Sequence, residues 1–226
     1  MSVEVKICGL KDAANVAAAL QAGADFIGLV FYGPSPRFVA PDDAAALADL
    51  ARGRARIVAL VVDPGDDLVA EIAAKVRPDY IQAHGSETPE RIGEIARLAG
   101  VPVIKAIKVR APEDVEGARA YREAAEMILF DAAAPETLEG ALPGGNGIAF
   151  DWTLLSADAR PRRFVLSGGL DAGNVAKAIF LTGAPIVDVS SGVEARPGVK
   201  SPDRIRKFIA MAKAARQIAG RQVRKT

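Results

Sequence analysis

A repeated alternation of two kinds of segment constrains the fold of this chain more than any other feature. A helical pattern rich in alanine ends in a glycine or proline turn, and a short run of β-prone apolar residues follows. We find eight such runs, and most of them are continuously apolar. Continuous apolar runs are typical of strands that are covered on both faces, and hence of a parallel sheet. The predicted strands lie at residues 3–8, 25–31, 56–63, 79–84, 101–108, 127–131, 163–167 and 185–191.

Helical patterns separate these strands. The first has Asp12 near its start and Gly23 at its end, and the last begins with Ser201 as a candidate N-cap followed by Pro202. The sixth unit is irregular, because residues 133–155 form a long glycine-rich stretch that ends in a short helical piece. Long loops in compact domains are often functional. The predicted helices cover residues 11–24, 41–51, 66–76, 88–100, 111–121, 171–183 and 201–220.

Eight strand–helix units in 226 residues leave about 28 residues a unit, which is near the minimum for a compact unit of a barrel. The pattern therefore predicts an α/β protein in which residues 1–226 form one domain, a single (β/α)8 TIM barrel. An open, doubly wound sheet is the main alternative. The first strand is not followed by a glycine-rich dinucleotide fingerprint, which argues against that alternative.

Composition narrows the possible partners. Lysine and arginine total 29 and aspartate and glutamate total 28, so we expect neither a nucleic-acid partner nor a membrane partner. The single cysteine cannot form an internal disulfide, which fits a reducing compartment. The first residues lack the basic and long apolar regions of a signal peptide, and no apolar run approaches the ~18–20 residues of a membrane span. We therefore expect a cytoplasmic protein.

Polar residues follow the predicted strands at their carboxyl ends, which is where barrels carry their chemistry. The last two strands are followed by Ser167-Gly168-Gly169 and by the run from Asp188 to Gly192. Glycine-rich loops after strands seven and eight commonly bind phosphate through backbone N–H groups, although each loop taken singly also fits an ordinary tight turn. The polar residues at the other strand ends are Cys8, Arg37, Asp63, His84, Lys105, Lys108 and Asp131.

These motifs resemble those of the phosphoribosylanthranilate isomerases of tryptophan biosynthesis, in the order of that family and from end to end of the chain. The resemblance implies a (β/α)8 barrel that uses no metal and no organic cofactor. It implies conversion of N-(5-phosphoribosyl)anthranilate to 1-(2-carboxyphenylamino)-1-deoxyribulose 5-phosphate, an Amadori rearrangement. The matching stretches are "KICGL" (6–10), "GADFIGLVFYGPSPRFV" (23–39), "IQAHG" (81–85), "ILFD" (128–131), "GGNGIAFDW" (144–152), "LSGGL" (166–170) and "DVSSGVEARPGVKS" (188–201).

The resemblance also implies roles for individual residues. Cys8 is the expected general base and Asp131 the expected general acid, while Arg37 is expected to meet the anthranilate carboxylate. The chain departs from the commoner family pattern at Ala83, Asn146 and Ser201, and none of these changes removes a group that the chemistry needs. The remaining expected substrate-binding residues are Gly168, Gly169, Ser190 and Gly192, which would bind the phosphate, and Asp188, which would orient substrate hydroxyls or serve only as a polar residue of the barrel interior.

The substrate that the resemblance implies is an aminal, with a nitrogen and the ring oxygen on the same sugar carbon. This chemistry explains why an acid and a base are needed. Opening the furanose requires a proton on the ring oxygen, which a carboxyl group in its protonated form can supply. The resulting iminium ion acidifies the C2′ proton, so a thiolate can remove it, and a nearby ammonium group would favour that thiolate. Lys105 and Lys108 are candidates for this ammonium group, although a solvated lysine is the commoner outcome at such positions. His84 either contacts the substrate or hydrogen-bonds within the barrel top.

Two other functions stay open at this point. One is a bifunctional phosphosugar isomerase shared with histidine biosynthesis, and the other is a barrel that binds a phosphate ligand without catalysis. The chain has no clear two-fold repeat, and it has a thiol at the base position, which argues against the first. The joint presence of Cys8 and Asp131 argues against the second. We expect a small-molecule phosphosugar as the ligand and a monomer or homodimer as the assembly.

Overall fold

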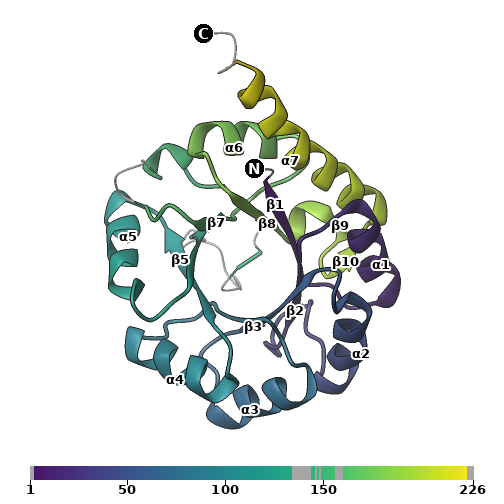
Figure 1. Cartoon of the computed structure of the whole chain (residues 1–226), viewed down its shortest axis with the longest axis vertical. Helices are drawn as coiled ribbons and strands as arrows, with labels where there is room; N and C mark the ends of the chain where they lie inside the picture. The colour runs from purple at the N-terminus through teal and green to yellow at the C-terminus, as the bar shows by residue number, and fades with distance from the viewer. Residues whose placement is uncertain (1–2, 134–143, 146, 148, 156–159, 223–226) are drawn as a thin grey trace.

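The computed structural model describes residues 3–133, 144, 145, 147, 149–155 and 160–222, with side chains up to residue 215. Eight parallel strands follow one another around a closed barrel in the order of the chain (Figure 1). β1 pairs with both β2 and β8, which closes the ring and confirms the predicted (β/α)8 architecture. The strands are β1 Glu4–Cys8, β2 Phe26–Val30, β3 Arg56–Val61, β4 Tyr80–Ala83, β5 Val103–Val109, β6 Met127–Ala132, β7 Phe164–Leu166 and β8 Ile186–Val189.

Helices form a ring outside the barrel (Figure 1). The Asp12 side chain caps α1 by accepting a hydrogen bond from the backbone N–H of Asn15 at 2.8 Å, and Gly23 ends that helix with a φ of 89°. Among the described residues, none of the helices has the length and apolar character that crossing a membrane requires. The α-helices are α1 Ala13–Ala22, α2 Pro41–Ala51, α3 Asp66–Lys75, α4 Pro89–Ala99, α5 Pro112–Gly117, α6 Val175–Thr182 and α7 Pro202–Gln222.

Alternation along the strands divides the apolar core into two parts. Outward-facing residues such as Ile7, Ile81 and Phe130 pack against the helices in the larger cluster. Successive side chains point to opposite faces of a strand, so the residues between them face the barrel interior. There the smaller cluster fills the lower part of the barrel with Phe26, Val58, Ile104, Ala106, Met127, Leu129, Val165 and Ile186. This packing fills the barrel below the carboxyl ends of the strands, where the polar side chains lie.

Two parts of the chain depart from a regular barrel. In the sixth unit, the described residues contain only a short 3-10 helix, η2 at Trp152–Leu154, and much of the long loop predicted at 133–155 lies outside the described residues. After β8 the chain forms a 3-10 turn, η3 at Ser191–Val193, and then an antiparallel hairpin that the sequence pattern did not predict. Its strands are β9 Glu194–Arg196 and β10 Val199–Lys200.

Candidate active site

A cavity with about 740 Å³ of empty space, part of it open to solvent, lies at the carboxyl ends of the barrel strands. Both predicted catalytic residues, Cys8 and Asp131, line it from β1 and β6. Five of the six predicted substrate-binding residues line the same cavity, and Gly192 lies behind them, packed against Leu170. The fold therefore brings together groups that lie up to 182 positions apart in the sequence. The five are Arg37, Gly168, Gly169, Asp188 and Ser190.

The Cys8 thiol lies at the end of β1 on the inward face and is 4% exposed. Lys6 shares that face, because it precedes Cys8 by two positions on the strand. A Cβ atom at Gly28 of β2 would lie 2.9 Å from Cys8 Sγ and 3.1 Å from Lys6 Nζ, so both groups occupy the space that this glycine leaves. Burial raises the pKa of the Cys8 thiol, and the nearby charge of Lys6 opposes that rise.

Lys6 belongs to a buried polar chain beneath the thiol. Its Nζ donates to Asp188 Oδ1 at 2.9 Å, and both side chains are at least nine-tenths buried. Burial alone would lower the pKa of Lys6, but the charges of Asp188 and Cys8 outweigh burial and raise it. Ser167 Oγ donates to the other oxygen of Asp188 at 3.3 Å. Asp188 is therefore oriented from two sides, by Lys6 and by Ser167, with its strand ending at the cavity.

Asp131 lies on the inward face at the end of β6, with β7 and β8 between it and Cys8. One carboxyl oxygen, Oδ1, accepts from the backbone N–H of Ala132 at 3.0 Å, and Oδ2 lies 3.1 Å from His84 Nε2. The other ring nitrogen of His84 contacts Gln82 Nε2 at 3.0 Å. His84 thus hydrogen-bonds within the barrel top and to the predicted acid, which was one of the two interpretations left open for it.

The long loop after β6 touches this pair through its glycines. A Cβ atom at Gly144 would lie 2.7 Å from His84 Nε2 and 2.9 Å from Asp131 Oδ2. The backbone at Gly144 therefore lies directly over the carboxyl group, at a distance that only glycine permits. Its neighbour, Gly145, approaches the guanidinium group of Arg37 in the same way, and its carbonyl oxygen accepts from Arg37 Nη2 at 3.2 Å.

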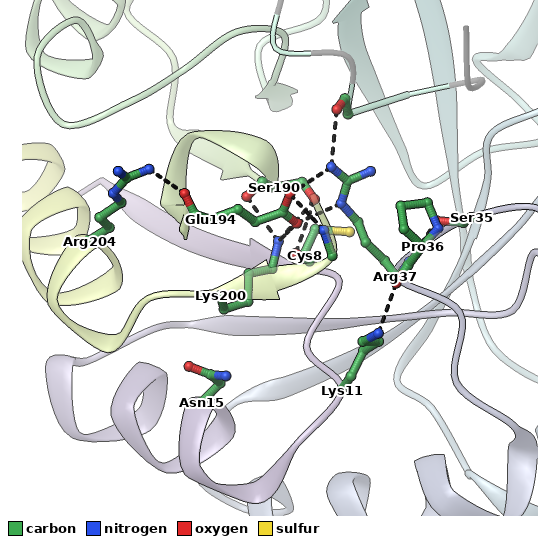
Figure 2. A network of polar contacts seen from close by, with 12 residues as sticks. Cys8, Lys11, Asn15, Ser35, Pro36, Arg37, Ser190, Glu194, Lys200 and Arg204 are labelled. Carbon is green, nitrogen blue, oxygen red and sulfur yellow. Dashed lines mark hydrogen bonds and ion pairs between the residues drawn. The ribbon is translucent and has the colours of Figure 1, made fainter. Parts of the chain in front are cut away.

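Arg37 extends from the loop after β2 into the cavity wall and is 5% exposed. Its Nε and Nη2 donate to the two carboxylate oxygens of Glu194 at 2.7 and 2.9 Å (Figure 2). Glu194 also accepts from Lys200 Nζ at 2.8 Å, and Lys200 donates to the carbonyl oxygen of Ser190 at 2.9 Å. Burial alone would raise the pKa of Glu194, but hydrogen bonds and charge from Arg37 and Lys200 hold its pKa below the ordinary value.

The loops after β7 and β8 form the side of the cavity next to Cys8. Gly168 and Gly169 both adopt positive φ, 85° and 60°, and a Cβ atom at Gly168 would lie 2.6 Å from the backbone nitrogen of Ala132. Ser190 continues β8 and donates from its hydroxyl to the carbonyl oxygen of Cys8 at 3.3 Å. Glycine at these positions lets the backbone come close to an oxyanion, as it does in loops that bind phosphate.

Comparison with known proteins agrees with this geometry. The family model described as N-(5'-phosphoribosyl)anthranilate (PRA) isomerase matches residues 5–211. The chain belongs to the phosphoribosylanthranilate isomerase family. A relative from Rhizobium johnstonii with this name is 50% identical over 208 residues, which cover 92% of this chain and 93% of the relative.

Solved members of the phosphoribosylanthranilate isomerase family share the whole barrel. The structure from Thermotoga maritima superposes with a TM-score of 0.82 at 37% identity. The match covers 94% of this chain and 99% of the Thermotoga maritima chain. Another crystal structure of the family, at 36% identity and a TM-score of 0.80, contains reduced 1-(o-carboxyphenylamino)-1-deoxyribulose 5-phosphate. It covers 94% of this chain and 99% of its own.

The hypothesis that Lys105 or Lys108 supplies the ammonium group near Cys8 is wrong. Lys105 does not support the thiol, because its Nζ is buried in an ion pair with Glu87 at 2.7 Å and also donates to the carbonyl oxygen of Gly85. Lys108 is exposed at the end of β5. The ammonium groups whose charge lowers the pKa of Cys8 belong to Lys6 and Lys200.

Three residues of the site were missed in the sequence. Lys6 had a readable signal, since it alternates with Cys8 in "KIC" and so shares its face of the strand. Glu194 and Lys200 had none, although both lie in a matching stretch, because nothing in their spacing predicted the hairpin. The register of that hairpin places Lys200 directly opposite Glu194.

Proposed function

We propose that this protein converts N-(5-phosphoribosyl)anthranilate to 1-(2-carboxyphenylamino)-1-deoxyribulose 5-phosphate, an isomerisation in tryptophan biosynthesis. Membership of the isomerase family supports this function. The observation that carries the mechanism is the placement of Cys8 and Asp131 on strands β1 and β6 of one cavity, with two strands, β7 and β8, and their glycine loops between them. This arrangement suits a sugar with an acid at its ring oxygen and a base at C2′.

Asp131 is the general acid in this proposal. It gives its proton to the furanose oxygen as the bond between that oxygen and C1′ breaks, and the lone pair of the anthranilate nitrogen forms the C=N bond of an iminium ion. Asp131 is left as a carboxylate. The contact of Oδ2 with His84 and of Oδ1 with the Ala132 N–H orients the carboxyl group for this transfer.

Cys8 is the general base. Its thiolate removes the proton from C2′, and the electrons of that C–H bond form the C1′–C2′ double bond of an enolamine as the iminium is neutralised. Tautomerisation then moves the hydroxyl proton of C2′ to C1′ and gives the ketone, so the product is an isomer of the substrate. Burial raises the pKa of Cys8 and so disfavours its thiolate, while the charge of Lys6 opposes this effect.

The remaining residues bind the ends of the substrate. Arg37 is the proposed partner of the anthranilate carboxylate, and the loops containing Gly168, Gly169 and Ser190 are the proposed phosphate site. Asp188 is proposed to orient substrate hydroxyls. Gly192 contributes indirectly on this proposal, because its missing side chain lets the loop after β8 pack against Leu170 of the loop after β7. The cytoplasmic location and the monomeric or homodimeric state stay predictions.

The decay of phosphoribosylanthranilate fluorescence, with substrate made in situ, tests the proposal. We expect the protein to accelerate this decay, and Cys8→Ala and Asp131→Asn each to lower kcat by ~10²–10⁴-fold with a much smaller change in KM. Asp203→Asn is the matched control, because the same change is made on an exposed residue of α7. Full activity of Cys8→Ala would refute the base assignment, and binding of reduced product without turnover would favour the non-catalytic alternative. Turnover of the histidine-pathway aminoaldose as well would favour the bifunctional one.

A further inference from the structure

Arg37 does not reach the cavity as a free side chain. A carboxylate from another part of the barrel occupies the Nε and Nη2 edge of its guanidinium group, with both oxygens of Glu194 engaged (Figure 2). The second hydrogen of Nη2 is directed to the carbonyl oxygen of Gly145 at 3.2 Å. Within the described part of the chain, no acceptor contacts Nη1, so this nitrogen is the donor left for a ligand.

The path of the Arg37 side chain is restricted along its length. A Cβ atom at Gly9 would lie 2.7 Å from Arg37 Cδ, and a Cβ atom at Gly145 would lie 2.7 Å from Nη1. Both glycines adopt positive φ of 77°. The arginine therefore lies between two glycine backbones, from the loops after β1 and β6, and Glu194 fixes the rotation of its planar end.

Glu194 is itself held in place by the hairpin. Lys200 lies directly opposite Glu194 across the two strands, and its Nζ donates a hydrogen bond to Oε1. The backbone N–H of Gly198 donates to Oε2 at 3.2 Å. The carboxylate thus accepts four hydrogen bonds and is 5% exposed. Such a group has no capacity left for substrate, and its contacts serve the residues around it.

We propose that Glu194 is a positioning residue for carboxylate recognition: it orients Arg37 so that Nη1 faces the carboxylate of the bound aromatic acid. This inference rests on the proposed function and deepens it. A negative charge beside Arg37 weakens the attraction of the guanidinium for a second carboxylate. The inference therefore requires that correct orientation contributes more to binding than this repulsion removes.

Two ligands separate orientation from general damage to the site. One is reduced 1-(2-carboxyphenylamino)-1-deoxyribulose 5-phosphate, and the other is the same compound with hydrogen in place of the carboxylate. The ratio of their dissociation constants, measured by calorimetry, reports carboxylate recognition alone. We expect Glu194→Gln to lower this preference by about tenfold and to leave the affinity for the second ligand within about twofold of the original.

A double-mutant cycle with Arg37→Ala identifies the group through which Glu194 acts. In the Arg37→Ala background, Glu194→Gln should leave the carboxylate preference unchanged, because the group that Glu194 positions is gone. If Glu194→Gln does not fold, Glu194→Asp replaces it. The shorter aspartate keeps the charge between Arg37 and Lys200, but cannot reach both Nε and Nη2, and we expect the same loss of preference.

Lys200→Met is the matched control. It removes the ammonium partner of Glu194 and leaves both hydrogen bonds between Glu194 and Arg37 in place. We expect it to weaken both ligands alike, through Ser190. Equal weakening of both ligands by Glu194→Gln, an unchanged preference, or tighter binding of the carboxylate ligand would each overturn the inference. Absence of turnover by the unchanged protein would instead refute the proposed function, independently of these ratios.

Discussion

His84 Nε2 lies 3.1 Å from Oδ2 of Asp131, so the only histidine of the chain hydrogen-bonds the carboxyl group that we propose as the general acid. Gln82 contacts the opposite ring nitrogen, and the three side chains form a buried row across β4 and β6. Gly144 closes over the row from the loop after β6. The imidazole ring of His84, which Gln82 holds in place, therefore restricts the orientation of the Asp131 carboxyl group.

Replacing this histidine should impair the chemical step more than binding. We expect His84→Ala to lower kcat by about 10–100-fold with a smaller change in KM, because Oδ2 of Asp131 loses its side-chain partner. His84→Asn, which retains a hydrogen-bonding amide, should recover part of the loss. Steady-state kinetics on both variants tests this, and equal kcat values for His84→Ala and the unchanged protein would show that the contact is only structural.

Removing the ammonium group beside Cys8 should make the thiol harder to ionise. We expect Lys6→Met to raise the pKa of Cys8 further, so the rise of the iodoacetamide alkylation rate with pH should move to higher pH. Since Asp188 raises the pKa of Cys8, the double variant Lys6→Met, Asp188→Asn should show a smaller shift than the single variant.

The same two variants also show how much the ion pair between Lys6 and Asp188 contributes to the stability of the fold, separately from its effect on the pKa of Cys8. Lys6→Met leaves Asp188 buried without its partner and should cost about 3–5 kcal/mol in the free energy of unfolding, part of which the double variant recovers. An alkylation profile that is identical in all three proteins would exclude an electrostatic role for Lys6.

The Cys8 thiol and the Lys6 ammonium group occupy the space that a side chain at position 28 would need. A methyl group there would lie 2.9 Å from Cys8 Sγ and 3.0 Å from Cys8 Cα, so we expect Gly28→Ala to displace Cys8 and to lower kcat by more than tenfold. Gly93→Ala on α4 is the control, because a Cβ atom there meets no atom within 4 Å. That change should leave activity intact and stabilise the helix by about 1 kcal/mol. Normal turnover of Gly28→Ala would contradict the tight packing.

The buried pair of Glu87 and Lys105 should make the fold sensitive to acid. Burial alone would raise the pKa of Glu87, but Lys105 outweighs burial and lowers it below the ordinary value of 4.5. A carboxylate whose pKa is lower in the folded than in the unfolded state contributes stability above the unfolded pKa, and this contribution is lost as pH falls through the folded one. The free energy of unfolding should therefore decrease as pH falls below about 4.5.

Denaturation with urea at several pH values measures this effect. Glu87→Gln should be destabilised at pH 7 and should show a shallower decline of stability in acid, because the titrating group is absent. Glu94→Gln, in an exposed pair with Arg91, is the matched control and should follow the unchanged protein. Parallel acid profiles for Glu87→Gln and the unchanged protein would show that other carboxylates account for the decline.

Much of the fold was predictable because its signals are local. Most strands are continuous apolar runs of β-prone residues, and caps such as Asp12 and Gly23 mark helix ends through bonds to nearby backbone. The hairpin after β8 lacked such signals. A two-residue strand such as Val199–Lys200 exists because of its pairing with Glu194–Arg196, and not because of its own composition.

The sequence by itself determined the barrel and the identity of the groups at the strand ends, since strand order fixes which residues reach the carboxyl face. It also contained the proximity of Lys6 to Cys8, because alternation along one strand is a local property. Only the tertiary structure decided that Glu194 orients Arg37 across 157 positions and that His84 contacts Asp131 across 47. Those contacts depend on how loops fold back over the barrel mouth, and the free energy that decides this comes from packing and ion pairing between distant segments rather than from the local residues.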